Sequence, residues 1–287
     1  MRQVMSTNPL DRLHGFDGGF TVLMAVYYKE DPLRFKRALV SVFSNTLVPD
    51  SMILVVDGPI PQSIDHIIID TLRNHNNFQV YRLPENRGLA YALNEGLSHV
   101  KTEWVVRADS DDINRPGRFE TQAKAIAMMI PPVDLLGGAI QEMDFDGTPL
   151  GVRRTVEMDS DIRLFARRRN PFNHMTIAYR TSLVRSVGGY PDIYLKEDYA
   201  LWASMIHAGA RCANLPDILV DAMTGREMYY RRGGLKYAIA EISLQRHLIT
   251  CNIKSSSHAI IDGVARSLVF MMPAFFRALF YTIMLRK

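Results

Sequence analysis

The sequence predicts an α/β fold with a mainly parallel central sheet flanked by helices. Over the first 130 residues, short apolar runs alternate with helical patterns, and two of the runs end at the acids Asp57 and Asp109. Alternating strands and helices form parallel sheets with right-handed crossovers. Because ligands bind such sheets beyond the carboxyl ends of the strands, we expect both acids to face one crevice.

The elements of the first half are predicted in chain order from apolar periodicity and turn residues. The first strand, at 20–28, stops at charged residues, and Pro32 then begins a helix at its first helical position. The other strands are expected at 52–56, 78–83 and 103–108, and the helices at 32–45, 63–74, 89–100 and 116–129.

The second half of the sequence is less regular. We expect strands at 135–142 and 176–179, a hairpin turn at 145–147 and a helix at 197–207. No internal repeat or low-complexity linker divides the chain. The predicted organisation is an N-terminal extension at 1–19, one large domain at 20–235 and a C-terminal helical region at 236–287.

A chain of 287 residues is long enough to bury a core without disulfide staples. The net charge of +4 suits an anionic ligand or an anionic membrane surface. No nucleic-acid-reading motif accompanies it, so no nucleic-acid partner is expected. Cys212 and Cys251 are predicted to be free thiols. Residues 1–19 lack the apolar centre of a signal peptide, so a cytoplasmic location is expected.

Three acids fall within four residues at Asp109-Ser110-Asp111-Asp112. Carboxylates this close repel one another unless a cation lies among them. Oxygen-only ligands favour Mg²⁺ or Mn²⁺, and such ions commonly bridge protein carboxylates to substrate phosphates. The alternative is a capped, acidic helix start. Because the cluster follows a predicted strand, we favour a metal site.

Two further motifs suit a nucleotide at the same edge of the sheet. Asp57 follows the second strand, where it can hydrogen-bond a base or ribose, although an Asp before Gly also forms turns. Asn86-Arg87-Gly88 precedes a helix whose free N–H groups favour anions, and Arg87 adds a guanidinium that pairs with phosphate. A plain turn before an amphipathic helix is the alternative for the second motif.

Glu197 and Asp198 begin the helix expected at 197–207. Adjacent acids at a helix start usually cap the helix or complement its dipole. A carboxylate beside an acceptor hydroxyl can instead take the hydroxyl proton as a general base. The residues alone leave both interpretations open.

In their order and spacing, these motifs resemble the family 2 glycosyltransferases, which have the GT-A fold. The resemblance rests on VVDGP at 55–59, ENRGLAYALNEGL at 85–97, RADSDDINRPGRFETQ at 107–122 and KEDYALW at 196–202. More narrowly, the sequence is similar to the amylovoran-biosynthesis type of bacterial exopolysaccharide and O-antigen enzymes. The similarity extends from about residue 20 to about residue 235.

The resemblance implies a role for each matching residue. Asp198, with Glu197 beside it, is the expected catalytic base, and the expected ligands of Mn²⁺ or Mg²⁺ are Asp109, Asp111 and Asp112. The residues expected to bind the nucleotide-sugar donor are Tyr27, Tyr28, Glu30, Asp57, Asn86, Arg87, Gly88, Asn94, Arg107, Asp109 and Ser110. The residues expected on the acceptor side are His174, Gly188, Gly189, Tyr190 and Trp202.

The resemblance further implies inverting transfer of a single sugar from a nucleotide-diphosphate sugar, such as a UDP-hexose. The implied acceptor is a saccharide linked to polyprenyl diphosphate, in bacterial surface polysaccharide synthesis. Two departures stand out: Gly58 replaces a second acid that many relatives have, and the Q-x-x-R-W signature of processive synthases is absent. Arg231-Arg232 stands in the later region instead, either to steady the diphosphate or as part of a surface loop.

Two other functions are weighed against this one. A sugar nucleotidyltransferase needs a glycine-rich basic loop after the first strand, where this sequence has Tyr-Tyr-Lys-Glu-Asp at 27–31. A non-catalytic member that only binds nucleotide-sugar has no need of both acidic pairs, at 109–111 and 197–198.

The sequence from 259 to 287 is strongly apolar with interspersed arginines. Pro273 and Arg277 interrupt the run of ~20 apolar residues that a membrane-spanning helix needs. We expect a helix on the inner face of the cell membrane, where a lipid-linked acceptor would be reached. The alternative is a terminal helix packed on the core of the domain. The basic run 167–169 is expected to meet acidic lipid or the acceptor diphosphate, or to be a solvated face.

Overall fold

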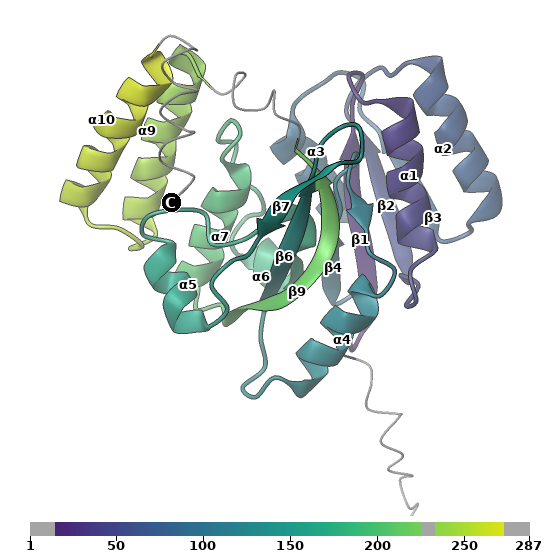
Figure 1. Cartoon of the computed structure of the whole chain (residues 1–287), viewed down its shortest axis with the longest axis horizontal. Helices are drawn as coiled ribbons and strands as arrows, with labels where there is room; N and C mark the ends of the chain where they lie inside the picture. Colours follow the sequence, from purple (N-terminus) through teal and green to yellow (C-terminus); the bar gives the residue numbers. More distant parts are fainter. Residues whose placement is uncertain (1–14, 225–232, 273–287) are drawn as a thin grey trace, which may run out of the picture.

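The computed structural model describes residues 15–224 and 233–272. In these residues a mixed sheet lies between two layers of helices, and a pair of C-terminal helices stands at one end of the molecule (Figure 1). The predicted α/β class with a sheet flanked by helices is confirmed.

Four parallel strands form one half of the sheet. They are β1 (Phe20–Val26), β2 (Ser51–Val56), β3 (Phe78–Arg82) and β4 (Trp104–Arg107), and they pair in the order β3–β2–β1–β4. Every residue of β1 is buried, because helices cover both faces of a parallel sheet. All four strands were predicted. The first ends two residues earlier than expected, so the tyrosines that follow Val26 lie beyond the strand.

The other half of the sheet mixes directions. β8 (Ala178–Arg180) pairs antiparallel with β4 and with β6 (Leu135–Met143), which in turn lies parallel to β9 (Cys212–Met223). The short β5 (Ile113–Asn114) and β7 (Pro149–Arg153) pair antiparallel with β9 and β6 respectively. The last pair forms the hairpin that the turn residues predicted.

One face of the sheet is covered by α1 (Pro32–Phe43), α2 (Gln62–Asn74) and α4 (Arg118–Met128). Asp31 caps α1 by accepting hydrogen bonds from two backbone N–H groups of the first turn, and a proline occupies the first helical position as predicted. The apolar side chains that join these helices to the strands include Val22, Met24, Phe35, Leu39, Ile64, Ile68 and Phe119.

The opposite face is covered by α3 (Leu89–His99), α6 (Thr181–Ser186) and α7 (Glu197–His207). The backbone of α3 lies so close to β1 that a Cβ atom added to Gly96 would be 2.4 Å from the side chain of Leu23. The core on this face includes Ile53, Val55, Leu93, Val105, Tyr179, Leu201 and Trp202.

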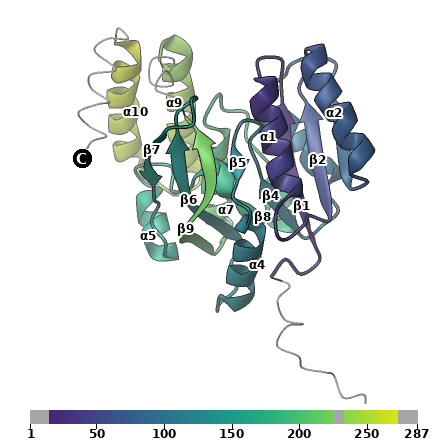
Figure 2. The ribbon, with the colours of Figure 1, turned by 45° about the vertical axis from the view of Figure 1, so that its right-hand side comes forward.

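Two C-terminal helices, α9 (Leu235–Thr250) and α10 (Ser256–Met271), stand side by side at the end of the molecule opposite α2 (Figures 1 and 2). Leu244 and Leu248 of α9 are buried in the same apolar cluster as the strands and α7, whereas α10 packs mainly on α9. The helix α9 therefore packs on the core of the domain. The segment expected to form a membrane-surface helix begins only at residue 259, within α10, so that expectation stays a prediction.

Within residues 15–224 and 233–272, no helix is long and apolar enough to cross a membrane. The arginines at 231 and 232 and the apolar residues at 273–287 lie outside the described residues. The division at 235 stays a prediction, and α9 begins at that point.

Candidate active site

Asp57, at the end of β2, holds the loop that begins α3. Its two carboxylate oxygens accept hydrogen bonds from the backbone N–H groups of Arg87, at 2.7 Å, and of Gly88, at 2.9 Å. The side-chain amide of Asn86 returns a bond of 3.1 Å to the carbonyl oxygen of Asp57. A buried carboxylate is thus satisfied by backbone donors, and the start of α3 is fixed against the edge of the sheet.

The packing of this loop explains why position 58 is a glycine. The backbone at Gly58 has a φ of +83°, which disfavours any side chain. A Cβ atom there would lie 2.5 Å from the backbone nitrogen of Asn86. The loop therefore occupies the space that a second carboxylate would need. Arg87 extends outward from it, with its guanidinium 3.6 Å from the centre of the Tyr91 ring.

The acidic tetrad lies just beyond β4, above a buried arginine. Arg107 is 1% exposed, donates a 3.2 Å hydrogen bond to the carbonyl oxygen of Leu23 and forms an ion pair with Asp109. Because the guanidinium of Arg107 is buried beneath residues 109–112, Arg107 would act on a bound donor through Asp109 and not by direct contact. Asp112 is also buried, and its carboxylate accepts a 2.7 Å bond from the backbone N–H of Met223, at the end of β9.

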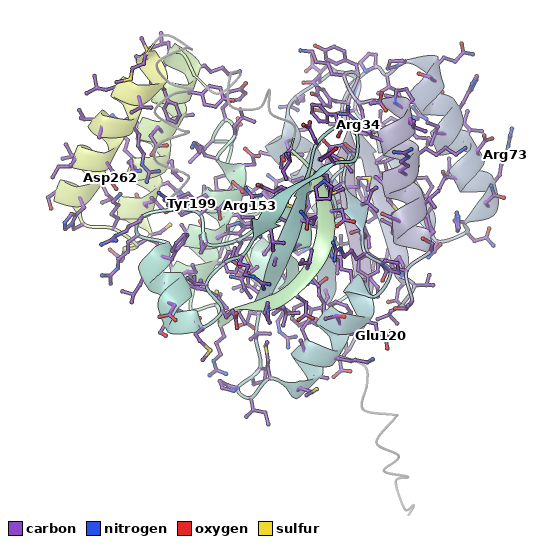
Figure 3. All side chains as sticks on the ribbon, viewed as in Figure 1. Arg34, Arg73, Glu120, Arg153, Tyr199 and Asp262 are labelled. Carbon is purple, nitrogen blue, oxygen red and sulfur yellow. The ribbon has the colours of Figure 1, made fainter. Side chains whose placement is uncertain are left out.

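The loop after β1 completes this wall of the site. Ser110 donates its hydroxyl hydrogen bond to Glu30, which joins the tetrad to the segment that follows Tyr27 and Tyr28. Both tyrosines are exposed, with ring centres 5.6 Å apart. Arg34, in the first turn of α1, lies close enough to lower the pKa of Glu30, although burial raises that pKa overall (Figure 3).

The carboxyl groups of this wall raise one another's pKa. Burial, and then the charges of Asp109 and Glu30, raise the pKa of Asp111 to about 7. Burial and the charge of Asp111 raise the pKa of Asp112 well above its usual range. A cation placed among these oxygens would relieve both effects, which is the electrostatic signature expected of a metal or diphosphate-metal site.

The described residues contain no preformed group of three His, Cys, Asp or Glu side chains that converge on a metal. Asp109 is paired with Arg107, and Asp112 accepts a backbone hydrogen bond. Asp111 is half-buried and, in the part of the chain that the structure describes, its carboxylate makes no hydrogen bond or ion pair with another residue. The donor set fits a hard cation whose remaining ligands come from a bound diphosphate, as is usual for Mg²⁺.

Glu197 and Asp198 begin α7 and form a second acidic wall. One carboxylate oxygen of Asp198 accepts a 2.6 Å bond from the side-chain amide of Asn170, and the other accepts a 2.6 Å bond from the N–H of Tyr199. Burial, and then the charge of Asp198, raise the pKa of Glu197 to about 7. The charge of Asp109 acts in the same direction, so the two acidic walls lie within electrostatic reach of each other.

His174 lies between the two walls, on the 3₁₀ turn His174–Thr176. Burial, and then the charge of Arg107, lower the pKa of His174, while Asp109 and Asp198 act in the opposite direction. The histidine is therefore neutral near pH 7. His174 is thus within electrostatic reach of Asp109, which follows β4, and of Asp198, in the first turn of α7. An expected metal ligand and the expected base therefore lie around one site.

The acceptor-side turn is held by α3. Asn94 accepts a 2.7 Å bond from the N–H of Tyr190 and donates a 2.8 Å bond to its carbonyl oxygen. Both polar atoms of the Asn94 side chain are engaged in this way, so it supports the Gly188-Gly189 turn. Trp202 is fully buried and Tyr190 nearly so, and their ring centres are 6.4 Å apart. These two side chains pack beneath the residues expected on the acceptor side. Neither has an exposed surface that an acceptor could contact.

Two residues at the site have partners that the sequence did not predict. Asn170 was missed because an Asn in an irregular segment carries no periodic signal. Arg118, in the first turn of α4, is fully buried and donates a 2.7 Å bond to the carbonyl oxygen of Arg107. Burial lowers the pKa of Arg118 to about 9. The sequence signal available for the burial of Arg118 was its position directly before Phe119, a core residue.

This site and fold define a glycosyltransferase. Residues 21–130 match the Glycosyl transferase family 2. The chain is 37% identical, over 93% of its length and 97% of the relative, to the UDP-Gal:alpha-D-GlcNAc-diphosphoundecaprenol beta-1,3-galactosyltransferase of Escherichia coli. It is 34% identical, over 88% of its length and 94% of the relative, to the amylovoran biosynthesis glycosyltransferase AmsE of Erwinia amylovora. The chain belongs to glycosyltransferase family 2, as its motifs predicted.

Solved structures of other glycosyltransferases share the fold. S. aureus TarS 1-349 in complex with UDP-GlcNAc superposes with a TM-score of 0.63 at 19% identity, over 87% of this chain and 71% of TarS 1-349. The chain spans 43% of a longer TarS chain. The mannosyltransferase PcManGT of Pyrobaculum calidifontis, in complex with GDP-Man and Mn²⁺, gives a TM-score of 0.56 at 17% identity, over 93% of this chain and 88% of PcManGT. The predicted GT-A fold is confirmed.

Proposed function

We propose that this glycosyltransferase moves one hexose from a UDP-sugar to a hydroxyl of a lipid-linked saccharide, with inversion at the anomeric carbon. The observation that carries the proposal is the position of His174, which lies within electrostatic reach of both Asp109 and Asp198. A diphosphate leaving group held at the first acid and an acceptor hydroxyl held at the second would then meet on opposite sides of one sugar.

The donor is proposed to lie along the carboxyl ends of β1, β2 and β4. The exposed rings of Tyr27 and Tyr28 offer faces for a base, and Asp57 places the start of α3 where its backbone N–H groups favour an anion. The remaining donor contacts are proposed to come from Glu30, Asn86, Arg87, Gly88, Asp109 and Ser110.

Asp111 is the proposed ligand of Mn²⁺ or Mg²⁺, with Asp109 and Asp112 supporting it. When bound, such a cation supplies positive charge that offsets the charge that develops on the departing UDP. The raised pKa of Asp111 supports this assignment, because a carboxylate forced among other acids gains most from a cation. PcManGT, which shares the fold, was solved in complex with GDP-Man and Mn²⁺.

Asp198 is the proposed catalytic base. Its carboxylate takes the proton of the acceptor hydroxyl while that oxygen forms a bond to the anomeric carbon. The bond from the same carbon to the diphosphate oxygen breaks, and its electron pair leaves with UDP. A single in-line displacement of this kind inverts the configuration. Glu197, whose raised pKa keeps it half protonated near pH 7, limits the negative charge beside the base.

The acceptor is proposed to be a saccharide on polyprenyl diphosphate, like the GlcNAc-diphosphoundecaprenol acceptor of the Escherichia coli relative. An acceptor of this kind lies at a membrane, and α10 offers a surface for one. Its outward side chains are apolar and more than half exposed, and they are Ile260, Ile261, Val264, Leu268 and Met271. Its buried side consists of Ala259, Gly263 and Phe270, and the partly exposed Asp262 and Arg266 form ion pairs with Lys254 and Glu241.

The basic run at 167–169 is exposed beside α10, because the carbonyl oxygen of Arg168 accepts a hydrogen bond from Arg266. An apolar helix face beside three arginines suits a membrane with anionic lipids. Asn170, which bonds Asp198, follows this run directly. The proposed lipid surface therefore adjoins the proposed base.

The test is transfer by the purified chain with Mn²⁺, a panel of UDP-hexoses and a GlcNAc-diphospho-lipid acceptor of short chain length. We expect UDP release that depends on the acceptor, and a disaccharide whose anomeric configuration, measured by NMR coupling constants, is opposite to that of the donor. Retention of configuration would overturn the inverting mechanism. Formation of UTP from a UDP-hexose and added pyrophosphate, or binding of UDP-hexoses without transfer to any acceptor, would overturn the proposed activity.

A further inference from the structure

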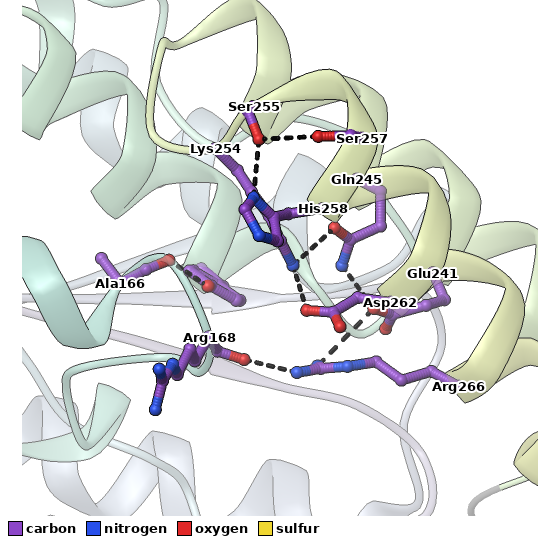
Figure 4. Close-up of polar contacts among 11 residues, drawn as sticks. Ala166, Arg168, Glu241, Gln245, Lys254, Ser255, Ser257, His258, Asp262 and Arg266 are labelled. Atoms are coloured by element: carbon purple, nitrogen blue, oxygen red, sulfur yellow. Dashed lines mark hydrogen bonds and ion pairs between the residues drawn. The ribbon is translucent and has the colours of Figure 1, made fainter.

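Glu241 of α9 is fully buried, and its two oxygens face cations from two other parts of the chain. One oxygen lies 3.3 Å from the ammonium nitrogen of Lys196, and the other lies 3.6 Å from the guanidinium of Arg266 and accepts a 2.8 Å bond from Gln245. A buried carboxylate is stable only when it is paired in this way. Glu241 therefore fixes the two cations relative to each other, and Figure 4 shows its contacts with Arg266 and Gln245.

Lys196 and Arg266 each hold one of the two chain segments that the hydrogen bond between Asn170 and Asp198 joins. Lys196 is the N-cap residue of α7 and directly precedes Glu197 and Asp198. Arg266 donates a hydrogen bond to the carbonyl oxygen of Arg168, two residues before Asn170 (Figure 4). The first segment carries the carboxylate of Asp198, and the second carries the amide that orients it.

The irregular segment that contains Arg168 and Asn170 has a second bond to α7 near the same place. The hydroxyl of Tyr199, directly after Asp198, donates to the carbonyl oxygen of Ala166, at the end of α5 (Asp159–Phe165) (Figure 4). The position of Asp198 relative to Asn170 is thus set from the protein interior by Tyr199 and from the C-terminal helices by Glu241.

We infer that Glu241 is a positioning residue for transfer, and that α9 and α10 form part of the catalytic unit through Lys196 and Arg266. This inference rests on the proposed function, because it needs Asp198 to be the base. It gives the C-terminal helices a role in the chemical step that is separate from any contact with lipid.

The test is a double-mutant cycle between Glu241→Gln and Asp198→Asn. Glu241→Gln keeps the side-chain volume and an oxygen for Gln245 but removes the charge that holds Lys196 and Arg266. We expect kcat to fall roughly 10-fold to 100-fold, the range that a small misplacement of a reacting group costs, while the donor KM is unchanged. In the Asp198→Asn background, the same substitution should cause no further loss.

The control is Glu103→Gln, which removes an ion pair with Arg180. Glu103 directly precedes β4, at the end of that strand opposite the acidic residues 109–112. We expect Glu103→Gln to lower the melting temperature without changing kcat. If Glu241→Gln does not fold, Arg266→Met, at a partly exposed site, replaces it in the cycle with the same expectation.

Equal losses from Glu241→Gln in the wild-type and Asp198→Asn backgrounds would overturn the inference while leaving the base assignment intact. A parallel fall in donor affinity would also overturn it, because the effect would then be general. If Asp198→Asn alone retains near wild-type transfer, the base assignment fails, and the positioning role fails with it.

Discussion

The side-chain amide of Asn170 donates a 2.6 Å hydrogen bond to the carboxylate of Asp198. The bond joins an irregular segment to the first turn of α7. Hydrogen bonds to charged groups contribute about 1.5–3 kcal/mol. Asn170 therefore orients the proposed base.

The first prediction concerns this bond. Asn170→Ala should lower kcat roughly 10-fold to 100-fold, because 1.36 kcal/mol corresponds to a tenfold change in rate. The donor KM should not change. Steady-state kinetics with saturating acceptor measure both, and Asn74→Ala, at an exposed helix end, is the control. A normal kcat for Asn170→Ala would separate Asn170 from catalysis.

The second prediction concerns the buried pair of Arg107 and Asp109. Arg107→Met leaves the carboxylate of Asp109 without its partner and should lower the free energy of unfolding by about 3–5 kcal/mol. Urea denaturation monitored by circular dichroism measures this change. Arg73→Met, which removes an ion pair that is exposed on both sides, should change stability little. Equal effects of the two substitutions would contradict the structural importance of Arg107.

The third prediction concerns Glu197 and pH. The folded pKa of about 7 exceeds the ordinary value of 4.5, so the folded state binds the proton more tightly than the unfolded state. The resulting stability is present below about pH 4.5 and is lost as pH rises through about 7. Asp111 contributes a loss of the same sign, so the comparison must be between variants.

Glu197→Gln should therefore weaken the decline in unfolding free energy between pH 5 and pH 8, a range chosen around the pKa of about 7. Urea denaturation at several pH values, for the wild type and the variant, gives the difference curve. A flat difference curve would mean that Glu197 titrates as it does in the unfolded chain.

The fourth prediction compares two adjacent glycines with left-handed backbone. At Gly188 an added Cβ atom would meet nothing within 4 Å, whereas at Gly189 it would lie 2.3 Å from the side-chain oxygen of Asn94. Gly188→Ala should cost about 1–2 kcal/mol from backbone strain alone. Gly189→Ala should cost more and should also impair transfer, because it displaces Asn94. Similar losses in both variants would show that the Asn94 contact is unimportant.

The fifth prediction concerns the apolar face of α10. Replacement of Val264 and Leu268 by serine should reduce co-sedimentation with vesicles that contain anionic phospholipid, because about 25 cal/mol is lost per Å² of apolar surface no longer buried. Val40→Ser, at an equally exposed valine on α1, should leave binding unchanged. Unaltered vesicle binding by the double variant would remove α10 from the proposed membrane surface.

The first half of the fold was predictable because its strands are apolar on both faces and its helices are amphipathic. The expected ends of these elements agree with the structure to within two residues. One detail was wrong: the periodicity of α2 suggests that Leu72 faces inward, yet it is 41% exposed, because α2 covers the sheet only near Ile64 and Ile68.

The twelve-residue strand β9 was not predicted. Pro216 and Asp217 interrupt its apolar pattern, and both residues are typical of turns. In the structure the register with β6 jumps from Leu215 to Ile218, so these two residues bulge out while the strand continues. Because β6 continues to pair with β9 on both sides of this bulge, the local sequence alone does not show that the strand continues.

The candidate site was predictable where residues follow strands or begin helices. Sequence order alone placed Asp57, the acidic residues 109–112 and Asp198 at ends of elements, and in the structure Asp109 and Asp198 both lie within electrostatic reach of His174. The hydrogen-bond partners were not predictable. Asp57 and Asn94 use their polar atoms on backbone groups of other loops, and such long-range pairing depends on the tertiary structure.

The link from Glu241 to Lys196 has a practical consequence for protein engineering. Truncating the chain before α9, in order to improve its handling in dilute buffer, would remove Glu241. Lys196, the N-cap residue of α7, would then lose its buried counter-ion. A shortened enzyme that lost activity would then say nothing about where lipid binds. Point changes on the outer face of α10 alter one property at a time.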